Sequence, residues 1–151
     1  MKMFYVERLQ TYSPEDAAQL GHLRPILSEG KSDDPVPEQH LRQIIESPTS
    51  EQLVARLEES RRIIGAATLT ILSGALSDRK GWLNDFVTDP DVRVRGIGRA
   101  LWNKMGRWCM ENDIDLTFTS HESRAAAHNF YLKQGAEIRE TTVFIKRFDQ
   151  S

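Results

Sequence analysis

A glycine-containing segment between a predicted strand and a predicted helix constrains this chain more than any other feature. Trp82 to Thr88 is rich in β-branched and aromatic residues and runs into Asp89-Pro90-Asp91, a pattern typical of a strand that ends in a turn. Farther on, apolar residues recur at i, i+4, i+7 and i+8, namely Leu101, Met105, Trp108 and Cys109. That spacing places them on one face of a helix. We therefore expect a strand, a tight turn and a helix over residues 82–109.

The turn contains Gly96 and Gly98 at the expected start of the helix. Glycine lets the backbone turn tightly and lets a ligand approach, and the first amides of a helix have no intrahelical partner. Such a helix start can receive an anion, most naturally a phosphate. A dinucleotide-binding G-x-G-x-x-G pattern is excluded because Leu101 stands at the third glycine position, and no G-x-x-x-x-G-K-[ST] is present. What remains is R-x-x-G-x-G, for which a simple turn without a ligand is the alternative.

The rest of the chain predicts further strands and helices. Apolar patterning predicts strands at 3–9, 52–58, 61–72, 113–120 and 137–148, with a turn-rich hairpin loop at 73–81. Ser13-Pro14 begins a helix that stops near Arg24 or kinks at Pro25, and a short second helix contains Leu41, Ile44 and Ile45. The 61–72 strand is apolar on both faces, which favours a central position, and Gly65 indicates a bulge or a close approach. We expect a parallel crossover between the strands at 82–88 and 113–120.

A second motif follows in the last quarter of the chain. The segment from Ser123 to Ala136 predicts a helix that Gly135 terminates. Together with R-x-x-G-x-G, this segment resembles the GNAT superfamily of N-acetyltransferases, whose pattern here is matched by Ala127, Phe130, Tyr131, Lys133 and Gly135. Arg124 and Ala136 depart from it, where the family has Asn and Phe. The resemblance implies an α/β (mixed α+β) GNAT acyltransferase fold, with a central twisted mixed sheet flanked by helices, over a single N-acetyltransferase domain at 1–151.

The same resemblance implies a binding site for acetyl-CoA as the cosubstrate. In the family, the strand before the glycine turn meets the pantetheine arm through its backbone, and the turn holds the pyrophosphate. Arg124 replaces a family Asn and would change how that arm is held. The implied cofactor-binding residues are Phe86, Val87, Thr88, Arg93, Val94, Arg95, Gly96, Ile97, Gly98, Arg99 and Arg124.

Acetyl transfer to an amine needs a base for the amine and a proton for the leaving thiolate. The resemblance assigns the proton to Tyr131, and a phenol can donate as charge develops on sulfur. The alternative is a core tyrosine. Asp85 lies on the opposite strand face from Phe86 and is the best-placed carboxylate for the amine proton. It could instead accept hydrogen bonds from loop amides. His121 and His128 are weaker base candidates.

These features predict an enzyme that moves the acetyl group of acetyl-CoA to a primary amine of a small molecule or a peptide. The alternative is a catalytically silent acyl-CoA-binding sensor or scaffold module of the same fold. O-acylation and longer acyl groups also stay open. Glu29 to Glu38 has an acidic excess that would attract a cationic amine, or that only solvates the loop. The charged run at 58–62 is interpreted as a solvated hairpin turn.

Composition excludes several other classes. A net charge of −2 gives no pull toward nucleic acid, and no apolar run has the length of a membrane span or a signal peptide. We therefore expect a cytoplasmic protein with no nucleic-acid or membrane partner. The one cysteine, Cys109, is expected to be a buried free thiol, and no Cys/His cluster has metal-ligand spacing, so no metal is expected. The oligomeric state is open, with a homodimer as one option.

Overall fold

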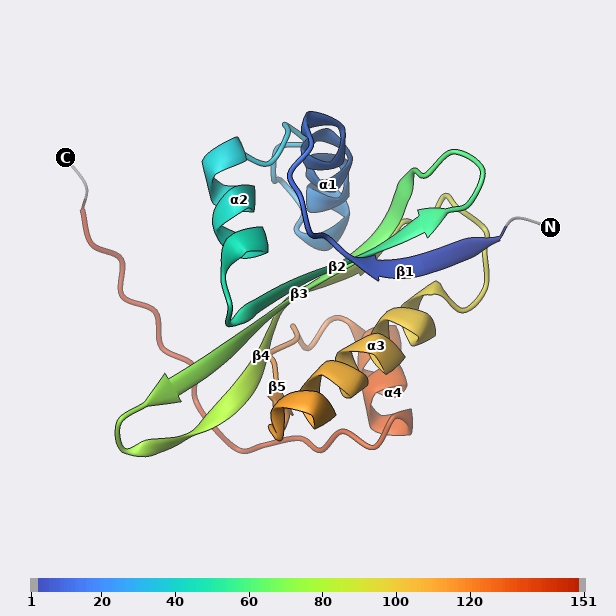
Figure 1. Cartoon of the computed structure of the whole chain (residues 1–151). Coiled ribbons are helices and arrows are strands. Elements are labelled where there is room, and N and C mark those ends of the chain that lie inside the picture. Colours follow the sequence, from blue (N-terminus) through green and yellow to red (C-terminus); the bar gives the residue numbers. More distant parts are fainter. Residues whose placement is uncertain (1–2, 150–151) are drawn as a thin grey trace. The chain divides into compact units, whose positions relative to one another are not determined.

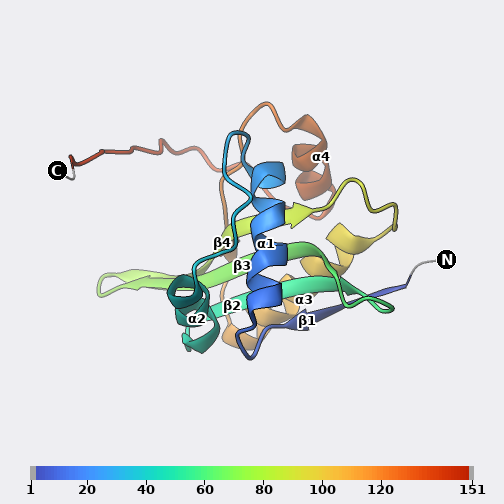
Figure 2. The ribbon, with the colours of Figure 1, turned by 90° about the horizontal axis from the view of Figure 1, so that it is seen from above.

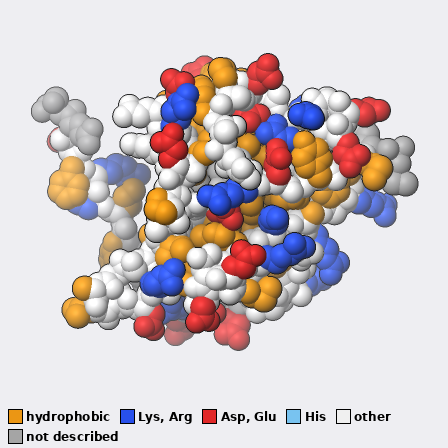
Figure 3. Space-filling view, in the orientation of Figure 1, with side chains coloured by type: hydrophobic (Ala, Val, Ile, Leu, Met, Phe, Trp, Pro, Cys, Tyr) orange, Lys and Arg blue, Asp and Glu red, His pale blue; other side chains and the backbone are white. Residues whose placement is uncertain are grey.

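The computed structural model describes residues 3–149 and consists of two compact parts. The first spans Met1–Phe118 and the second Thr119–Ser151, and each is described by itself. On the face of the molecule seen in Figure 1, acidic and basic side chains are interspersed (Figure 3). None of the helices in the range 3–149 combines the length and the apolar character that crossing a bilayer requires.

A five-stranded mixed sheet forms the centre of the first part, in the order β1-β2-β3-β4-β5 (Figure 1). The first four strands are antiparallel neighbours: β1 (Phe4–Arg8), β2 (Ser50–Leu57), β3 (Ile63–Gly74) and β4 (Ser77–Thr88). The short β5 (Leu116–Thr117) pairs parallel with β4, as the sequence predicted. The expected mixed α/β architecture is therefore confirmed.

Helices cover both faces of this sheet. Figure 2 shows α1 (Pro14–Leu27) and α2 (Glu38–Glu46) on one face and α3 (Ile97–Asn112) on the other. Two hydrophobic clusters fill the two interfaces, one around Leu23, Leu41 and Val54 and one around Leu53, Leu69 and Leu101. Leu53 and Val54 are consecutive residues that serve opposite clusters, because side chains alternate along a strand. This burial on both sides explains the apolar patterning of the central strands.

The first helix begins as predicted, and it continues past Pro25 and does not stop near Arg24, which was one of the two predicted alternatives. The Ser13 hydroxyl accepts a hydrogen bond from the Asp16 amide at 3.0 Å, and Pro14 occupies the first turn. Pro25 lies inside the helix, which continues to Leu27. A proline there removes only the bond to the carbonyl four residues earlier, and the Ser28 amide still closes the last turn on Arg24 O at 2.9 Å.

The hairpin predicted at 73–81 is present, but its loop is shorter than predicted. Strands β3 and β4 continue as a hairpin until Gly74 pairs with Ser77. Residues 72–80 are exposed, so no apolar alternation marks this part of the ladder. Backbone pairing extends a strand beyond its buried segment, and sequence patterning detects only the buried segment.

The C-terminal strand predictions need two corrections. The strand predicted at 113–120 is reduced to Leu116–Thr117, because pairing with β4 occurs only at Gly81 and Trp82. The strand predicted at 137–148 is absent from the described residues, where this segment has no paired strand and Phe144 is 88% exposed. In the second part, α4 (Ala125–Lys133) is followed by Gly135 at φ +89°, the left-handed stop that the sequence predicted.

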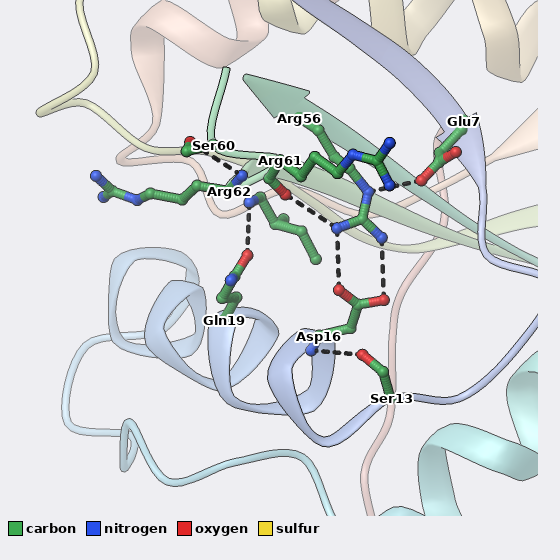
Figure 4. Close-up of polar contacts among 9 residues, drawn as sticks. Glu7, Ser13, Asp16, Gln19, Arg56, Ser60, Arg61 and Arg62 are labelled. Carbon is green, nitrogen blue, oxygen red and sulfur yellow. Dashed lines mark hydrogen bonds and ion pairs between the residues drawn. The ribbon is translucent and has the colours of Figure 1, made fainter. Parts of the chain in front are cut away.

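A buried arginine ties α1 to the sheet (Figure 4). Arg56 of β2 donates to both carboxylate oxygens of Asp16, at 2.9 Å from Nη1 and 3.0 Å from Nη2, and its Nε donates to Glu7 of β1 at 2.6 Å. Its Nη1 also donates to the Arg61 carbonyl at 3.1 Å. These hydrogen bonds raise the pKa of Arg56. The side chains of Arg56 and Asp16 are only 10% and 13% exposed, so neither charge is well hydrated on its own.

We predict that Asp16→Ala lowers the free energy of unfolding by about 3 kcal/mol, because it leaves a buried guanidinium without its bidentate partner. The matched control is Glu15→Ala, an exposed acid in the same helical turn, which should cost no more than about 1 kcal/mol. Urea denaturation of both variants measures the difference. Equal losses in the two variants would contradict a structural role for the Arg56 pair.

Candidate active site

The loop between β4 and α3 is anchored at its base by Asp89. The Asp89 carboxylate pairs with Arg62 Nη2 at 2.9 Å and accepts the Asp91 amide at 3.0 Å, while the Asp89 amide donates to Ile64 O at 2.8 Å. Val92 is buried in the core next to the loop. Sequence reasoning missed Arg62, which it placed in a solvated turn. An Asp that precedes proline at a strand end is a typical loop acceptor, and this was the available signal.

The start of α3 forms an electropositive cradle. Gly96 is the N-cap residue at φ +88°, no side chain caps the helix, and its first turn carries no acid. Within residues 3–149, the amides of residues 97–99 have no hydrogen-bond acceptor. A Cβ built on Gly96 would meet nothing within 4 Å, so the space beside the N-cap residue is open. Exposed arginines flank it at positions 93, 95 and 99. This arrangement suits a phosphate group.

The end of β4 lies next to this helix start. A Cβ on Gly98 would lie 3.9 Å from both Phe86 Cζ and Thr88 Cγ2. Beyond Trp82, the only described strand that pairs with β4 is β3, since β5 is paired no farther. The structure therefore brings together the two segments predicted to bind the cofactor, 86–88 and 93–99.

The residues of β4 face different layers. Phe86 packs on the α3 side, where its ring centroid is 6.3 Å from that of Trp102, and Trp102 in turn meets Phe118 edge-on at 6.0 Å. Val87 packs on the opposite side, against the cluster under α1 and α2. Truncation of Phe86 or Val87 would therefore change packing, as expected for positions predicted to act through their backbone.

A β-bulge interrupts β4 just before this segment. Thr68 is paired with Asp85 and Leu69 with Leu83, so Asn84 is the extra residue. Residues in register share a face, which puts Asp85 with Thr68 on the α1–α2 side and opposite Phe86. Asp85 is exposed, and among the described residues its carboxylate has no hydrogen-bond or ionic partner. The loop amide at position 91 is bound by Asp89 instead.

Tyr131 and Arg124 belong to the second part of the chain and lie together at α4. Arg124 is the N-cap residue, and its carbonyl accepts the His128 amide at 3.0 Å. The Tyr131 ring contacts Phe130 at a centroid distance of 5.9 Å. Burial raises the pKa of Tyr131, and the positive charge of Arg124 opposes that rise. The phenol therefore keeps its proton at neutral pH. His121 is exposed and shares a hydrogen bond of 2.7 Å with Ser123.

The family follows from a comparison of the sequence with protein families. The sequence model of the acetyltransferase (GNAT) family matches residues 18–136. The chain belongs to the GNAT family. The match includes both segments on which the resemblance rested, the R-x-x-G-x-G turn and the helix with Tyr131. The sequence matches none of the curated proteins with which it was compared.

Solved structures share the fold of this GNAT chain. The aminoglycoside acetyltransferase meta-AAC0020, from an uncultured soil metagenomic sample and in complex with trehalose, aligns at 21% identity over 97% of each chain with a TM-score of 0.80. The aminoglycoside N-acetyltransferase AAC(6')-Iy, in complex with CoA, aligns at 17% identity over 97% of this chain and 96% of that chain, with a TM-score of 0.76. The aminoglycoside 6'-N-acetyltransferase AAC(6')-Ih from Acinetobacter baumannii aligns at 18% identity over 98% of this chain and 100% of that chain, with a TM-score of 0.73.

We predict that Asp89→Ala loosens the GNAT loop, because it leaves the Arg62 guanidinium and the Asp91 amide without their acceptor. The cost to stability should be about 1 to 3 kcal/mol, and amide hydrogen exchange at 91–94 should accelerate. Asp91→Ala is the matched control, since that side chain is exposed and should leave exchange almost unchanged. Unaltered exchange in Asp89→Ala would show that the loop does not depend on this carboxylate.

Proposed function

We propose that this GNAT protein transfers the acetyl group of acetyl-CoA to a primary amine of a small molecule or a peptide, and that residues 1–151 act as one N-acetyltransferase domain. The observation that carries the proposal is the open, acid-free start of α3 beside the end of β4. The family match across residues 18–136 supports a single functional domain, because it spans both compact parts. The fold shared with aminoglycoside acetyltransferases agrees with an amine acceptor.

The cradle provides the groups that hold the cosubstrate. The amides of Ile97, Gly98 and Arg99, which have no acceptor among the described residues, would bind the pyrophosphate, and the nearby Arg93 and Arg95 would add positive charge. The backbone of β4 from Phe86 to Thr88 would meet the pantetheine arm. It would do so on the edge of β4 away from β3, where the pairing with β5 does not extend past Trp82. Acetyl-CoA supplies an acyl thioester to this site.

Two side chains account for the protons. Asp85, exposed and without a partner among the described residues, would accept a proton from the amine, directly or through water. The amine nitrogen then forms a bond to the thioester carbonyl carbon, the carbon–sulfur bond breaks, and the nitrogen releases its remaining extra proton to water. Tyr131 would give its proton to the departing thiolate, and its raised pKa keeps that proton available at neutral pH. The products are an acetamide and coenzyme A.

Acetyl-CoA should raise the melting temperature, since a ligand at 100 times its Kd adds about 2.7 kcal/mol to stability. Gly96→Glu should abolish the rise, because it puts a side chain and a negative charge into the cradle. Gly30→Glu is the matched control: Gly30 also has a positive φ of +83° and open space around it, so backbone strain is equal. A full thermal shift in Gly96→Glu would refute the assignment of the loop.

Tyr131→Phe removes only the hydroxyl, so the fold should persist while kcat falls roughly ten- to a thousandfold. Wild-type kcat should stay level from about pH 7 to about pH 9, because the raised pKa of Tyr131 keeps the donor protonated there. Tyr5→Phe, in β1, serves as the control and should leave kcat unchanged. Thiol release with saturating acetyl-CoA measures both. Binding of acetyl-CoA without turnover of any amine would instead favour the silent binding module.

A further inference from the structure

Polar side chains form a row across three neighbouring strands on the sheet face that α1 and α2 cover. Gln52 of β2 is in register with Thr68 of β3, and Thr68 is in register with Asp85 of β4. Asn84, the extra residue of the bulge, reaches the same face, because its side chain contacts Thr70 two residues along from Thr68. Gln52 and Thr68 are only 4% and 7% exposed, whereas Asn84 and Asp85 are exposed.

The buried end of this row has a fixed hydrogen-bond direction. The Gln52 amide nitrogen lies 3.2 Å from Leu53 O and 3.3 Å from Ala67 O, so this atom must be the donor, and the opposite orientation would set three oxygens against each other. The Gln52 Oε1 atom must therefore accept. The Thr68 hydroxyl donates its only hydrogen to this oxygen at 2.8 Å.

The exposed end is fixed in the same way. Asn84 Nδ2 donates to Thr70 Oγ1 at 2.8 Å and faces the Thr68 carbonyl at 3.5 Å, so both amide hydrogens point into the protein. Among the described residues, Asn84 Oδ1 and the Asp85 carboxylate have no donor. We call the oxygens of Thr68 Oγ1, Asn84 Oδ1 and the Asp85 carboxylate the oxygen patch. The donors of Thr68 and Asn84 are used internally, and Asp85 in its ionised form has none.

We propose that the oxygen patch binds the primary ammonium group of the substrate and selects cationic amines over sugar phosphates; this inference rests on the proposed function. A primary ammonium has three N–H donors and no acceptor, which complements the three acceptor groups of the oxygen patch. The negative charge of Asp85 strengthens those bonds, and a phosphate group would meet unpaired oxygens and like charge. The ammonium held there lies next to the carboxylate proposed to take its proton.

Calorimetric titration tests the oxygen patch without turnover, using spermidine and sisomicin as cationic probes and glucose 6-phosphate as a sugar phosphate without an ammonium group. Asn84→Lys should weaken binding of both cationic probes about tenfold or more, since it replaces an acceptor by a cation. Ser77→Lys is the matched control, because it adds the same charge at an exposed position on the same strand. Its affinity should equal that of the wild type.

Two variants of Thr68 test the oxygen patch independently, in case the Asn84→Lys protein does not fold. Thr68→Val should weaken binding while Thr68→Ser, which keeps the hydroxyl, restores it. The inference is overturned if the wild type binds neither cationic probe, if it binds glucose 6-phosphate equally well, or if Asn84→Lys and Ser77→Lys bind the cationic probes equally well. Failure of the proposed function is a separate result: the wild type would bind the amines and yet release no thiol from acetyl-CoA.

Discussion

The close approach of α3 to the central strand is the contact on which the site depends. A Cβ on Gly65 would lie 3.1 Å from Ile97 Cγ2 and 3.2 Å from Leu101 Cδ1, which is tighter than packed side chains normally allow. A side chain at position 65 would force the helix residues to shift by a few tenths of an ångström, so glycine suits this close approach to β3. Gly65 is also in register with Thr88, the last residue of β4. The contact that seats the helix therefore also sets its first turn beside the end of β4.

Local sequence signals predicted the elements that carry their own chemistry. The Ser13 cap, the apolar face of α3 and the stop at Gly135 each depend on a few neighbouring residues, and the structure has all three. The bulge or close approach expected at Gly65 is also present, since the β2–β3 register shifts beside its partner Ala55. The family resemblance assigned cofactor binding to segments 86–88 and 93–99, and the structure places the end of β4 next to the start of α3, where Gly98 lies near Phe86 and Thr88.

The parts that the sequence did not predict depend on contacts between distant segments. Whether residues 113–120 form a full strand depends on how far β4 remains available for pairing, and that distance is not encoded locally. Arg62 looked like a solvated charge because its partner, Asp89, is far along the chain. The hydrogen-bond directions in the oxygen patch likewise arise only when β2, β3 and β4 are in register. Strand extent, ion pairs and polar orientation are therefore properties of the assembled sheet.

The bulge in β4 has a consequence for chain length. Leu83 and Phe86 both face α3, and a regular strand could achieve this with one residue fewer between them. Loss of Asn84 alone would thus restore ordinary alternation and keep every later side chain, including Thr88, on its present face. With Asn84 in place, β4 presents two neighbouring polar side chains, Asn84 and Asp85, on the same face of the sheet. The number of residues in this part of β4 can therefore change with the ligand without changing which side chains face the core.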